Sequence, residues 1–282
     1  MTHTELEWRT ADGLRLYAQE WRPDAQVRAV VCVLHGLGEH SGRYAHVAAV
    51  LAQAGYAFLG PDLRGHGRSE GQRGHAPSWD VLLDDVAVLI REAGGRCPGA
   101  PCFLYGHSLG ASLALSYVLR RKAQGAADLA GVIATGPILR TAFAPPAWKI
   151  ALGHVLYGLW PTFSMTNEVD PNGLSHDPQV ARAYLADPLV HNRVSARLGI
   201  GFLNEGEWLL AHAAEFPLPL LLMVGGADPI TSAQASQEFA ARVPADCTFK
   251  RWDGLYHEIH NEPQQGEVLA FLVFWLQAHT AP

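Results

Sequence analysis

The chain alternates between short apolar runs and longer stretches in which apolar residues recur every three or four positions. Expected strands cover 30–34, 57–60, 102–105 and 129–136, and expected helices cover 44–54, 79–92 and 109–120. The strands are continuously apolar, which is typical of strands that are covered on both faces. Strands and helices that follow one another in this way predict an α/β fold, with a mostly parallel sheet and helices on both faces.

The two ends of the chain extend this pattern differently. The N-terminal segment LEWRTADGLRLYAQEWRP alternates apolar and polar residues on either side of Asp12-Gly13, which predicts an antiparallel hairpin. Near residue 217 the alternation of strands and helices resumes. Further strands are expected at 217–228 and 247–252, and further helices at 232–242 and 267–277.

The interval 137–216 interrupts the alternation. It is rich in Trp, Tyr, Phe and Pro, indicates short helices, and is too long for a simple connection in a compact domain. We interpret it as an inserted helical cap over the carboxyl edge of the sheet, where open α/β sheets bind ligands. The core then comprises residues 1–136 and 217–282.

Composition limits the possible partners. A chain of 282 residues, 49% hydrophobic, suits one domain with an insertion. The formal charge of −6 and the lack of any run of five like charges argue against a nucleic-acid partner. The start MTHTELEWRT contains no apolar signal segment, so we expect a cytoplasmic protein. Four cysteines are too few for a disulfide scaffold; Cys97 and Cys102 are near enough in sequence to bridge a loop, but a reducing compartment disfavours this pairing.

The segment GHSLG, residues 106–110, places Ser108 between an expected strand and an expected helix. A serine on such a sharp turn needs glycine two positions before and after it, because larger side chains would clash. Its hydroxyl then points away from the sheet edge, beside the backbone N–H groups of a helix N-terminus. Ser108 is therefore the candidate nucleophile.

A serine nucleophile needs a base and an acid, which follow it in this architecture in the order serine, acid, histidine. Asp228 follows the strand that ends in VGGAD, and His257 follows the next strand after a short turn. His260 is better explained as a structural histidine with a satisfied hydrogen bond, and Asp253 as part of the turn before His257. Asp62, the other rival acid, precedes the serine and breaks the order. The expected triad is Ser108, Asp228 and His257.

The reaction also requires donors for the oxyanion. One is the backbone N–H of Leu109, directly after the nucleophile. The other is expected in the loop HGLGEH after strand 30–34, where the glycines allow close backbone approach; Leu37 is our candidate. No zinc signature and no G-x-G-x-x-G after a strand occurs, so neither a metal nor a cofactor is expected.

Six segments resemble the monoacylglycerol lipases and the bacterial lysophospholipase-like serine hydrolases grouped with them. They are HGLGEHSGRY (35–44), DLRGHGRSEGQRG (62–74), GHSLG (106–110), YLADPL (184–189), GGADPIT (225–231) and YHEIHNE (256–262). The resemblance implies an α/β-hydrolase fold with an apolar cap and hydrolysis of one fatty acyl ester to glycerol and fatty acid. It also supports the triad and both oxyanion donors. One departure is Ala111, where the family usually has a second glycine, and alanine is well tolerated in a helix.

The same resemblance implies a polar pocket for the alcohol half of the substrate. Its matching residues here are Glu39, Arg43, His107 and Tyr184. A glycerol leaving group needs two or three hydrogen-bond partners in an otherwise apolar pocket. The expected partner is therefore a small lipid ester.

Three alternative functions stay open at this point. A carboxylesterase or lysophospholipase would use the same triad on a different leaving group. An aminopeptidase would need carboxylates in the cap to bind an amine; Glu205 and Glu207 lie there, but we expect both to be solvated. A non-catalytic receptor would tolerate loss of a triad member, whereas all three are present.

The stretch IALGHVLYGLWPTF, residues 150–163, contains no Asp, Glu, Lys or Arg. Its helix is about half the roughly 20 residues needed to span a bilayer, and Pro161 ends it. It either packs wholly against the core, or lines an acyl tunnel and presents Leu156, Leu159 and Trp160 to a lipid surface. The second alternative predicts transient contact with a membrane surface.

Overall fold

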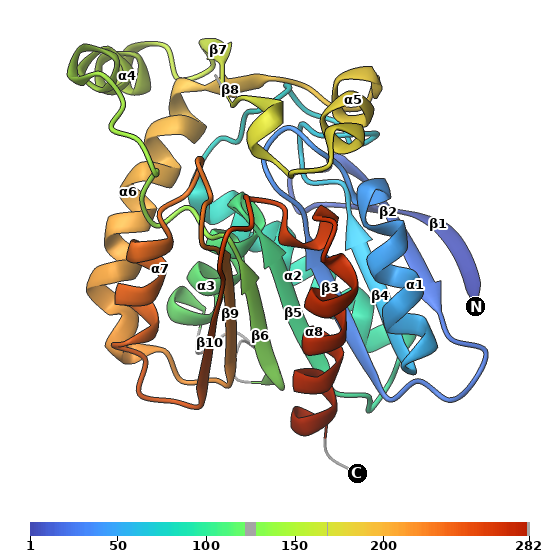
Figure 1. The fold of residues 1–282 in the computed structure, drawn as a ribbon. Coiled ribbons are helices and arrows are strands. Elements are labelled where there is room, and N and C mark those ends of the chain that lie inside the picture. The colour runs from blue at the N-terminus through green and yellow to red at the C-terminus, as the bar shows by residue number, and fades with distance from the viewer. Residues whose placement is uncertain (122–127, 168, 281–282) are drawn as a thin grey trace.

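A twisted sheet forms the centre of the computed structural model, which describes residues 1–121, 128–167 and 169–280 (Figure 1). The strands lie in the order β1-β2-β4-β3-β5-β6-β9-β10. Their bounds are β1 Thr2–Arg9, β2 Arg15–Arg22, β3 Ala29–Leu34, β4 Tyr56–Pro61, β5 Cys102–His107, β6 Gly131–Thr135, β9 Leu220–Gly225 and β10 Cys247–Trp252.

Pairing within the sheet follows the apolar pattern of the sequence. The N-terminal strands β1 and β2 form the predicted hairpin, and β2 pairs antiparallel with β4. All remaining pairs, from β4 to β10, are parallel. The predicted α/β class and mostly parallel sheet are therefore confirmed. Parallel strands end at the same edge, so the segments that follow β3, β5, β9 and β10 meet there.

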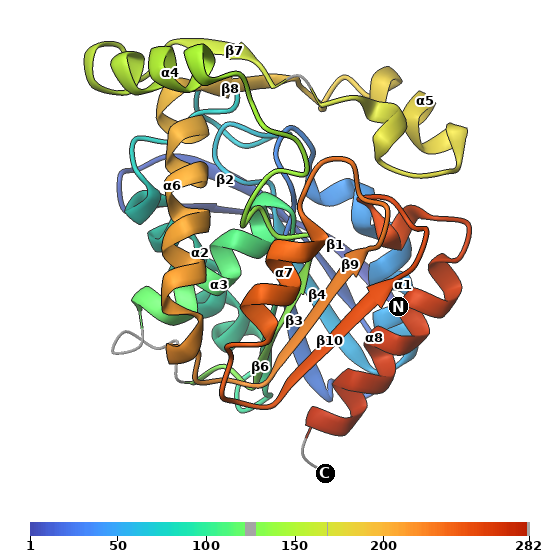
Figure 2. The ribbon, with the colours of Figure 1, turned by 60° about the vertical axis from the view of Figure 1, so that its left-hand side comes forward.

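Helices cover both faces of the sheet (Figures 1 and 2). On one face, α1 (Ala45–Gln53) and α8 (Gln265–His279) cover an apolar cluster centred on β3, β4 and β5. The opposite face is covered by α2 (Trp79–Arg96), α3 (Leu109–Arg120), α6 (Ala196–His212) and α7 (Ala233–Ala240). Short 3-10 turns occupy Ser41–Tyr44, Pro171–Gly173, Ala213–Glu215 and Ile259–Asn261.

The segment between β6 and β9 extends over the carboxyl edge of the sheet, at the top of Figure 1. It contains α4 (Ala147–Leu159), β7 (Ser164–Thr166), α5 (Pro178–Ala186) and β8 (Arg193–Ser195), and then α6, which runs down beside α3. None of the side chains of α4 is buried. The first alternative for residues 150–163, complete packing against the core, is therefore wrong.

Backbone contacts attach this segment to the loops of the core. The His191 N–H donates to Gly38 O at 2.9 Å, and the Ser195 N–H donates to Gly74 O at the same distance. A Cβ at Gly38 or Gly74 would approach the carbonyl oxygen of His191 or Arg193 within 2.3 Å, so glycine permits both contacts.

The four cysteines are free thiols. Cys102 Sγ lies 3.6 Å from Cys32 Sγ on the neighbouring strand, and the suggested bridge between Cys97 and Cys102 is not formed. Within the described residues, no helix combines the length and the apolarity that crossing a membrane requires.

Candidate active site

Ser108 occupies the strained turn between β5 and α3. Its φ of 52° is the one positive φ among the described non-glycine residues. A Cβ at Gly106 would lie 2.2 Å from Gly110 O, and a Cβ at Gly110 would lie 2.0 Å from Leu34 O. The two glycines therefore allow the helix to begin against β3 and β5, as the motif predicts. Ser108 itself is only 7% exposed and lines the main cavity.

Asp228 and His257 are brought together from two neighbouring loops. His257 Nδ1 lies 2.7 Å from Asp228 Oδ2, and both side chains are buried. Asp228 Oδ1 accepts from the N–H groups of Ile230 and Thr231, and Oδ2 also accepts from the Thr231 hydroxyl. These bonds fix the carboxylate, which in turn orients the imidazole.

His257 faces the same cavity as Ser108, although no hydrogen bond joins the Ser108 hydroxyl to His257 in the part of the chain that the structure describes. The imidazole packs against Gly136, where an added Cβ would lie 3.1 Å from its Cε1 atom. The cavity therefore contains the candidate nucleophile and the candidate base, and the candidate base is held by an acid.

The charges of this pair stabilise each other. Burial lowers the pKa of His257, but the Asp228 charge and hydrogen bond outweigh burial, and the net pKa is raised. Burial likewise opposes ionisation of Asp228, yet His257 and Thr231 lower its pKa below the ordinary value. The arrangement favours an ionised acid beside a histidine whose protonated form is stabilised.

Two backbone N–H groups flank Ser108. Leu109 begins α3, where the side chain of Ser108 makes no capping bond, and Leu37 follows Gly36 in the loop after β3. Within the described residues, neither N–H donates to a protein acceptor. The loop lies against the nucleophile, since a Cβ at Gly36 would be 3.2 Å from Ser108 Cβ. The geometry suits stabilisation of a negatively charged oxygen beside Ser108.

The main cavity, of about 230 Å³, extends from Ser108 to the underside of α4. Polar side chains gather at one end: Glu39, His107, Tyr184 and Glu258. The remainder is lined mainly by apolar side chains of α4, α6 and the segments that join them. Of the three side chains expected to face a lipid surface, Leu159 and Trp160 are exposed, whereas Leu156 lines the cavity.

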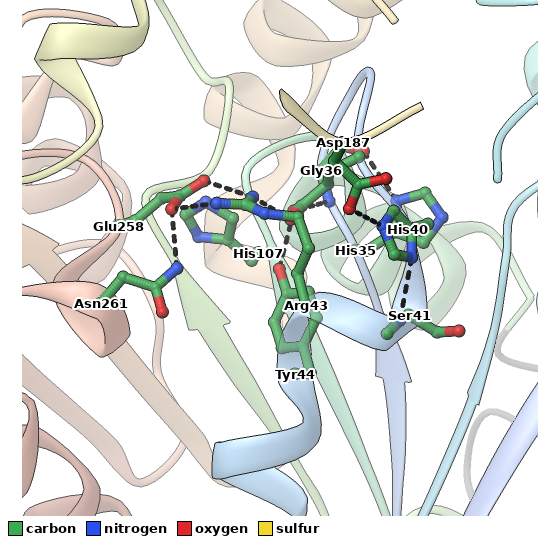
Figure 3. A network of polar contacts seen from close by, with 12 residues as sticks. His35, Gly36, His40, Ser41, Arg43, Tyr44, His107, Asp187, Glu258 and Asn261 are labelled. Atoms are coloured by element: carbon green, nitrogen blue, oxygen red, sulfur yellow. Dashed lines mark hydrogen bonds and ion pairs between the residues drawn. The ribbon is translucent and has the colours of Figure 1, made fainter. Parts of the chain in front are cut away.

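Arg43 differs from its expected role, because its guanidinium is already engaged below the cavity. Nη1 and Nη2 donate to the two oxygens of Glu258 at 2.7 Å each (Figure 3). Nη1 also donates to Glu39 Oε2 at 2.5 Å. The Tyr184 ring lies 5.0 Å above the guanidinium and lines the cavity in its place. Arg43 therefore holds two carboxylates and does not itself line the cavity.

Glu39 connects this cluster to the loop after β3. Its Oε1 accepts from the Gly36 N–H at 2.6 Å and from the Tyr44 hydroxyl at 2.8 Å. Burial opposes ionisation of Glu39 and Glu258, but Arg43 lowers the pKa of both. Two carboxylates and one guanidinium leave this end of the cavity with one excess negative charge.

The other two residues expected at the alcohol end line the cavity as well. Burial, reinforced by the neighbouring His257, lowers the pKa of His107 to about 4, so its imidazole is neutral. Its Nδ1 lies 3.1 Å from Thr135 Oγ1. Burial raises the pKa of Tyr184 to about 12, which keeps its hydroxyl protonated. Both side chains can therefore exchange hydrogen bonds with a neutral alcohol.

Sequence reasoning missed Glu258 and misjudged two other side chains. The position of Glu258 directly after the candidate base was the available signal, but the surrounding segment YHEIHNE is mostly polar and does not indicate an ion pair. The expectation that Glu205 is solvated is wrong: it is 5% exposed and accepts hydrogen bonds from Ser116 and Arg120. Glu207 is exposed and pairs with Arg140. His260 is buried as expected, but neither ring nitrogen has a hydrogen-bond partner within the described residues.

Three comparisons place this geometry among known proteins. The profile of the family described as serine aminopeptidase, S33, matches residues 25–264. A monoacylglycerol lipase of Mycolicibacterium smegmatis is 32% identical over 99% of this chain and 98% of its own. An abhydrolase domain-containing protein of Dictyostelium discoideum is 38% identical over 98% of this chain, which spans only 29% of that longer protein.

Solved structures share the fold. A monoacylglycerol lipase of Paleococcus ferrophilus superimposes with a TM-score of 0.85 at 35% identity, covering 94% of this chain and 99% of that one. A soluble variant of the monoglyceride lipase of Saccharomyces cerevisiae gives a TM-score of 0.90 at 23% identity, covering 100% and 97%. The second likeness supports the fold alone.

Proposed function

The chain belongs to the monoacylglycerol lipase-like family of α/β-hydrolases and is a carboxylic ester hydrolase, and from this premise we propose that it cleaves monoacylglycerols to glycerol and a fatty acid. The reaction proceeds through an acyl-enzyme on Ser108. The cavity carries the argument for this substrate, because its lining combines Glu39, His107, Tyr184 and Glu258 with many apolar side chains.

The proposed mechanism uses the same residues in both halves of the reaction. Ser108 Oγ attacks the ester carbonyl while His257 accepts its proton, and Asp228 stabilises the resulting imidazolium. The N–H groups of Leu37 and Leu109 donate to the oxyanion. His257 then transfers the proton to the glycerol oxygen, which leaves. A water molecule, deprotonated by His257, attacks the acyl-enzyme, and His257 returns the proton to Ser108 Oγ as the fatty acid leaves.

The charge at the polar end favours a neutral leaving group over an anionic one. Glu39 and Glu258 line the cavity with their carboxylates, and the single guanidinium of Arg43 neutralises only one of them. Glycerol hydroxyls can donate to these oxygens. A phosphate at this end would lie beside both carboxylates, and the guanidinium of Arg43 is already engaged with them, which costs free energy. Lys149 also lines the cavity, but from α4. This supports a monoacylglycerol lipase over a lysophospholipase.

Substrate enters from a lipid surface in this proposal. Leu159 is 82% exposed and Trp160 58% exposed at the end of α4, and Phe143, Trp148 and Val155 are exposed in the same segment. An exposed apolar cluster beside the cavity is suited to shallow insertion between lipid headgroups. Long-chain monoacylglycerol would then pass directly from the lipid surface into the apolar section.

The test compares leaving groups at constant acyl chain. Purified protein is assayed on oleoylglycerol, oleoyl lysophosphatidic acid, oleoyl lysophosphatidylcholine and ethyl oleate in mixed micelles of fixed composition. We expect kcat/KM to be at least about tenfold higher for oleoylglycerol than for either phosphate-bearing lipid. Equal values for oleoylglycerol and ethyl oleate would indicate a general carboxylesterase, and a preference for a lysophospholipid would refute the proposal.

A further inference from the structure

Helix α6 contains several glycines, although glycine is unfavourable inside a helix. Gly199, Gly201 and Gly206 lie within its 17 residues. Each glycine in a helix interior is destabilising by about 1 kcal/mol relative to alanine. The surroundings of each glycine therefore indicate what its missing side chain makes possible.

Two of the three have no bearing on the main cavity. A Cβ at Gly206 would lie 2.3 Å from Leu139 O, so this glycine allows α6 to approach the chain that leaves β6. A Cβ at Gly201 would have no atom within 4 Å. Gly201 borders a smaller, separate cavity of about 140 Å³ between α6 and the start of α2.

Gly199 is different because it lines the main cavity. A Cβ there would meet only Val194 Cγ2, at an ordinary contact distance of 3.6 Å. Close packing therefore does not explain this glycine. Other residues of α6 also line the cavity: Ala196, Phe202 and Leu203, which lie three or four positions from Gly199, and the adjacent Ile200. The side chains of Ile200 and Leu203 are large and take up room in the cavity, whereas Ala196 and Gly199 leave room beside them.

Ala196 and Gly199 lie toward the N-terminus of α6, on the side away from the sheet edge that holds Ser108. Gly206 packs near the sheet edge, and Gly199 is seven positions closer to the N-terminus of α6, which corresponds to about 10 Å along the helix. Figure 2 shows α4 lying across that upper end of α6. On α4, Gly153 also lines the cavity. This glycine lies against Ile200, because a Cβ added at residue 153 would be 2.8 Å from Ile200 Cδ1.

From these contacts we infer that Gly199 sets the upper limit on acyl chain length, by leaving open the distal section of the cavity that a long chain fills. This inference rests on the proposed function for the kind of ester that is cleaved. The path of the acyl chain is argued from the cavity alone. A side chain at residue 199 would occupy that section and leave the section beside Ser108 unchanged. Short acyl chains would still bind, and long ones would not.

The experiment pairs Gly199→Leu with Gly201→Leu on the same helix. Both substitutions add the same side chain and remove one helical glycine, but only residue 199 lines the main cavity. Each variant and the wild type are assayed on p-nitrophenyl butyrate, octanoate, laurate and palmitate. Because the leaving group is constant, the chain-length profile is read even if monoacylglycerol is not the substrate; a parallel assay on butyrylglycerol and oleoylglycerol tests that separately.

We expect Gly199→Leu to lower kcat/KM for palmitate about tenfold or more relative to butyrate, with butyrate within about threefold of wild type. Gly201→Leu should keep the wild-type profile. An unchanged profile for a folded Gly199→Leu variant, or an equal shift in both variants, overturns the inference. Should Gly199→Leu fail to fold, Gly199→Ala, which favours the helix, should still lower the palmitate to butyrate ratio about twofold, and an unchanged ratio overturns the inference.

Discussion

Helices α3 and α4 are both largely apolar but differ completely in burial. Residues 109–119 of α3 are all buried between the sheet and α6, whereas no residue of α4 is buried. In α3, apolar side chains stabilise the fold and fix Ser108, the proposed nucleophile, at the helix start. In α4, they line the cavity on one side and face solvent on the other. Apolar composition therefore serves folding in α3, and in α4 it lines the cavity where we propose that the acyl chain binds.

The strongest test of this contrast removes the nucleophile at the start of α3. Ser108→Ala should lower esterase kcat by about four orders of magnitude or more and abolish labelling by a fluorophosphonate, because the triad acts as a unit. The thermal unfolding midpoint should stay close to wild type, which excludes loss of folding as the cause. Full labelling of the variant would show that the nucleophile lies elsewhere.

The same leucine truncation should affect the two helices very differently. Leu113 in α3 is 0% exposed, so Leu113→Ala should lower the free energy of unfolding by about 2–5 kcal/mol. Leu159 in α4 is 82% exposed, and Leu159→Ala should change the free energy of unfolding by less than about 0.5 kcal/mol. Urea denaturation measures both values. Similar losses in the two variants would mean that α4 contributes to the core.

The buried site should also show a characteristic pH dependence. His257 accepts a proton only when neutral, and its pKa is raised above the ordinary 6.5. The kcat/KM should therefore fall about tenfold per pH unit below that raised pKa. Glu258→Gln removes one of the negative charges that raise it, so the acid limb should move to lower pH, as a pH–rate profile on a soluble ester would show. A shift to higher pH would contradict this assignment of charges.

The smallest expected effect concerns the exposed end of α4. Leu159→Ser with Trp160→Ser should reduce co-sedimentation with liposomes and lower activity on oleoylglycerol in vesicles by several-fold, with butyrate ester hydrolysis within about threefold of wild type. Phe274→Ser is the control, because Phe274 is also exposed, at 67%, but lies on α8 and not near α4 in the sequence. If the control loses liposome binding to the same extent, the contact is not specific to α4.

The sequence was most informative where local geometry is demanding. The strand-turn-helix at Ser108 needs glycine at both flanking positions, so the motif alone predicted the turn. The parallel sheet followed from continuously apolar strands, although the strand order did not. The helix expected at 79–92 continues to Arg96 through Gly94 and Gly95, which have open space around them and no packing signal in the sequence.

Long-range pairing of charged groups was the least predictable part of the site. Glu258 and Arg43 are 215 positions apart, and nothing in the local sequence of either indicates the other. Arg43 was therefore expected to contact substrate, and Glu205 to be solvated. Both expectations depended on which segments the fold brings together, and short motifs do not contain that information.

The connection between β6 and β9 has a consequence for how such a protein changes over generations. The two strands are neighbours in the sheet, yet residues 136–219 lie between them, and they include the whole region of α4 and α5. Closing a loop of that length costs about 4 kcal/mol of chain entropy, but doubling the length adds only about 0.6 kcal/mol. Insertions and deletions around α4 and α5 therefore cost the sheet little, whereas changes in α6 would disturb its packing in the core. Under the proposed function, acyl preference can therefore change through the region of α4 and α5 without any change at the sheet edge that holds Ser108.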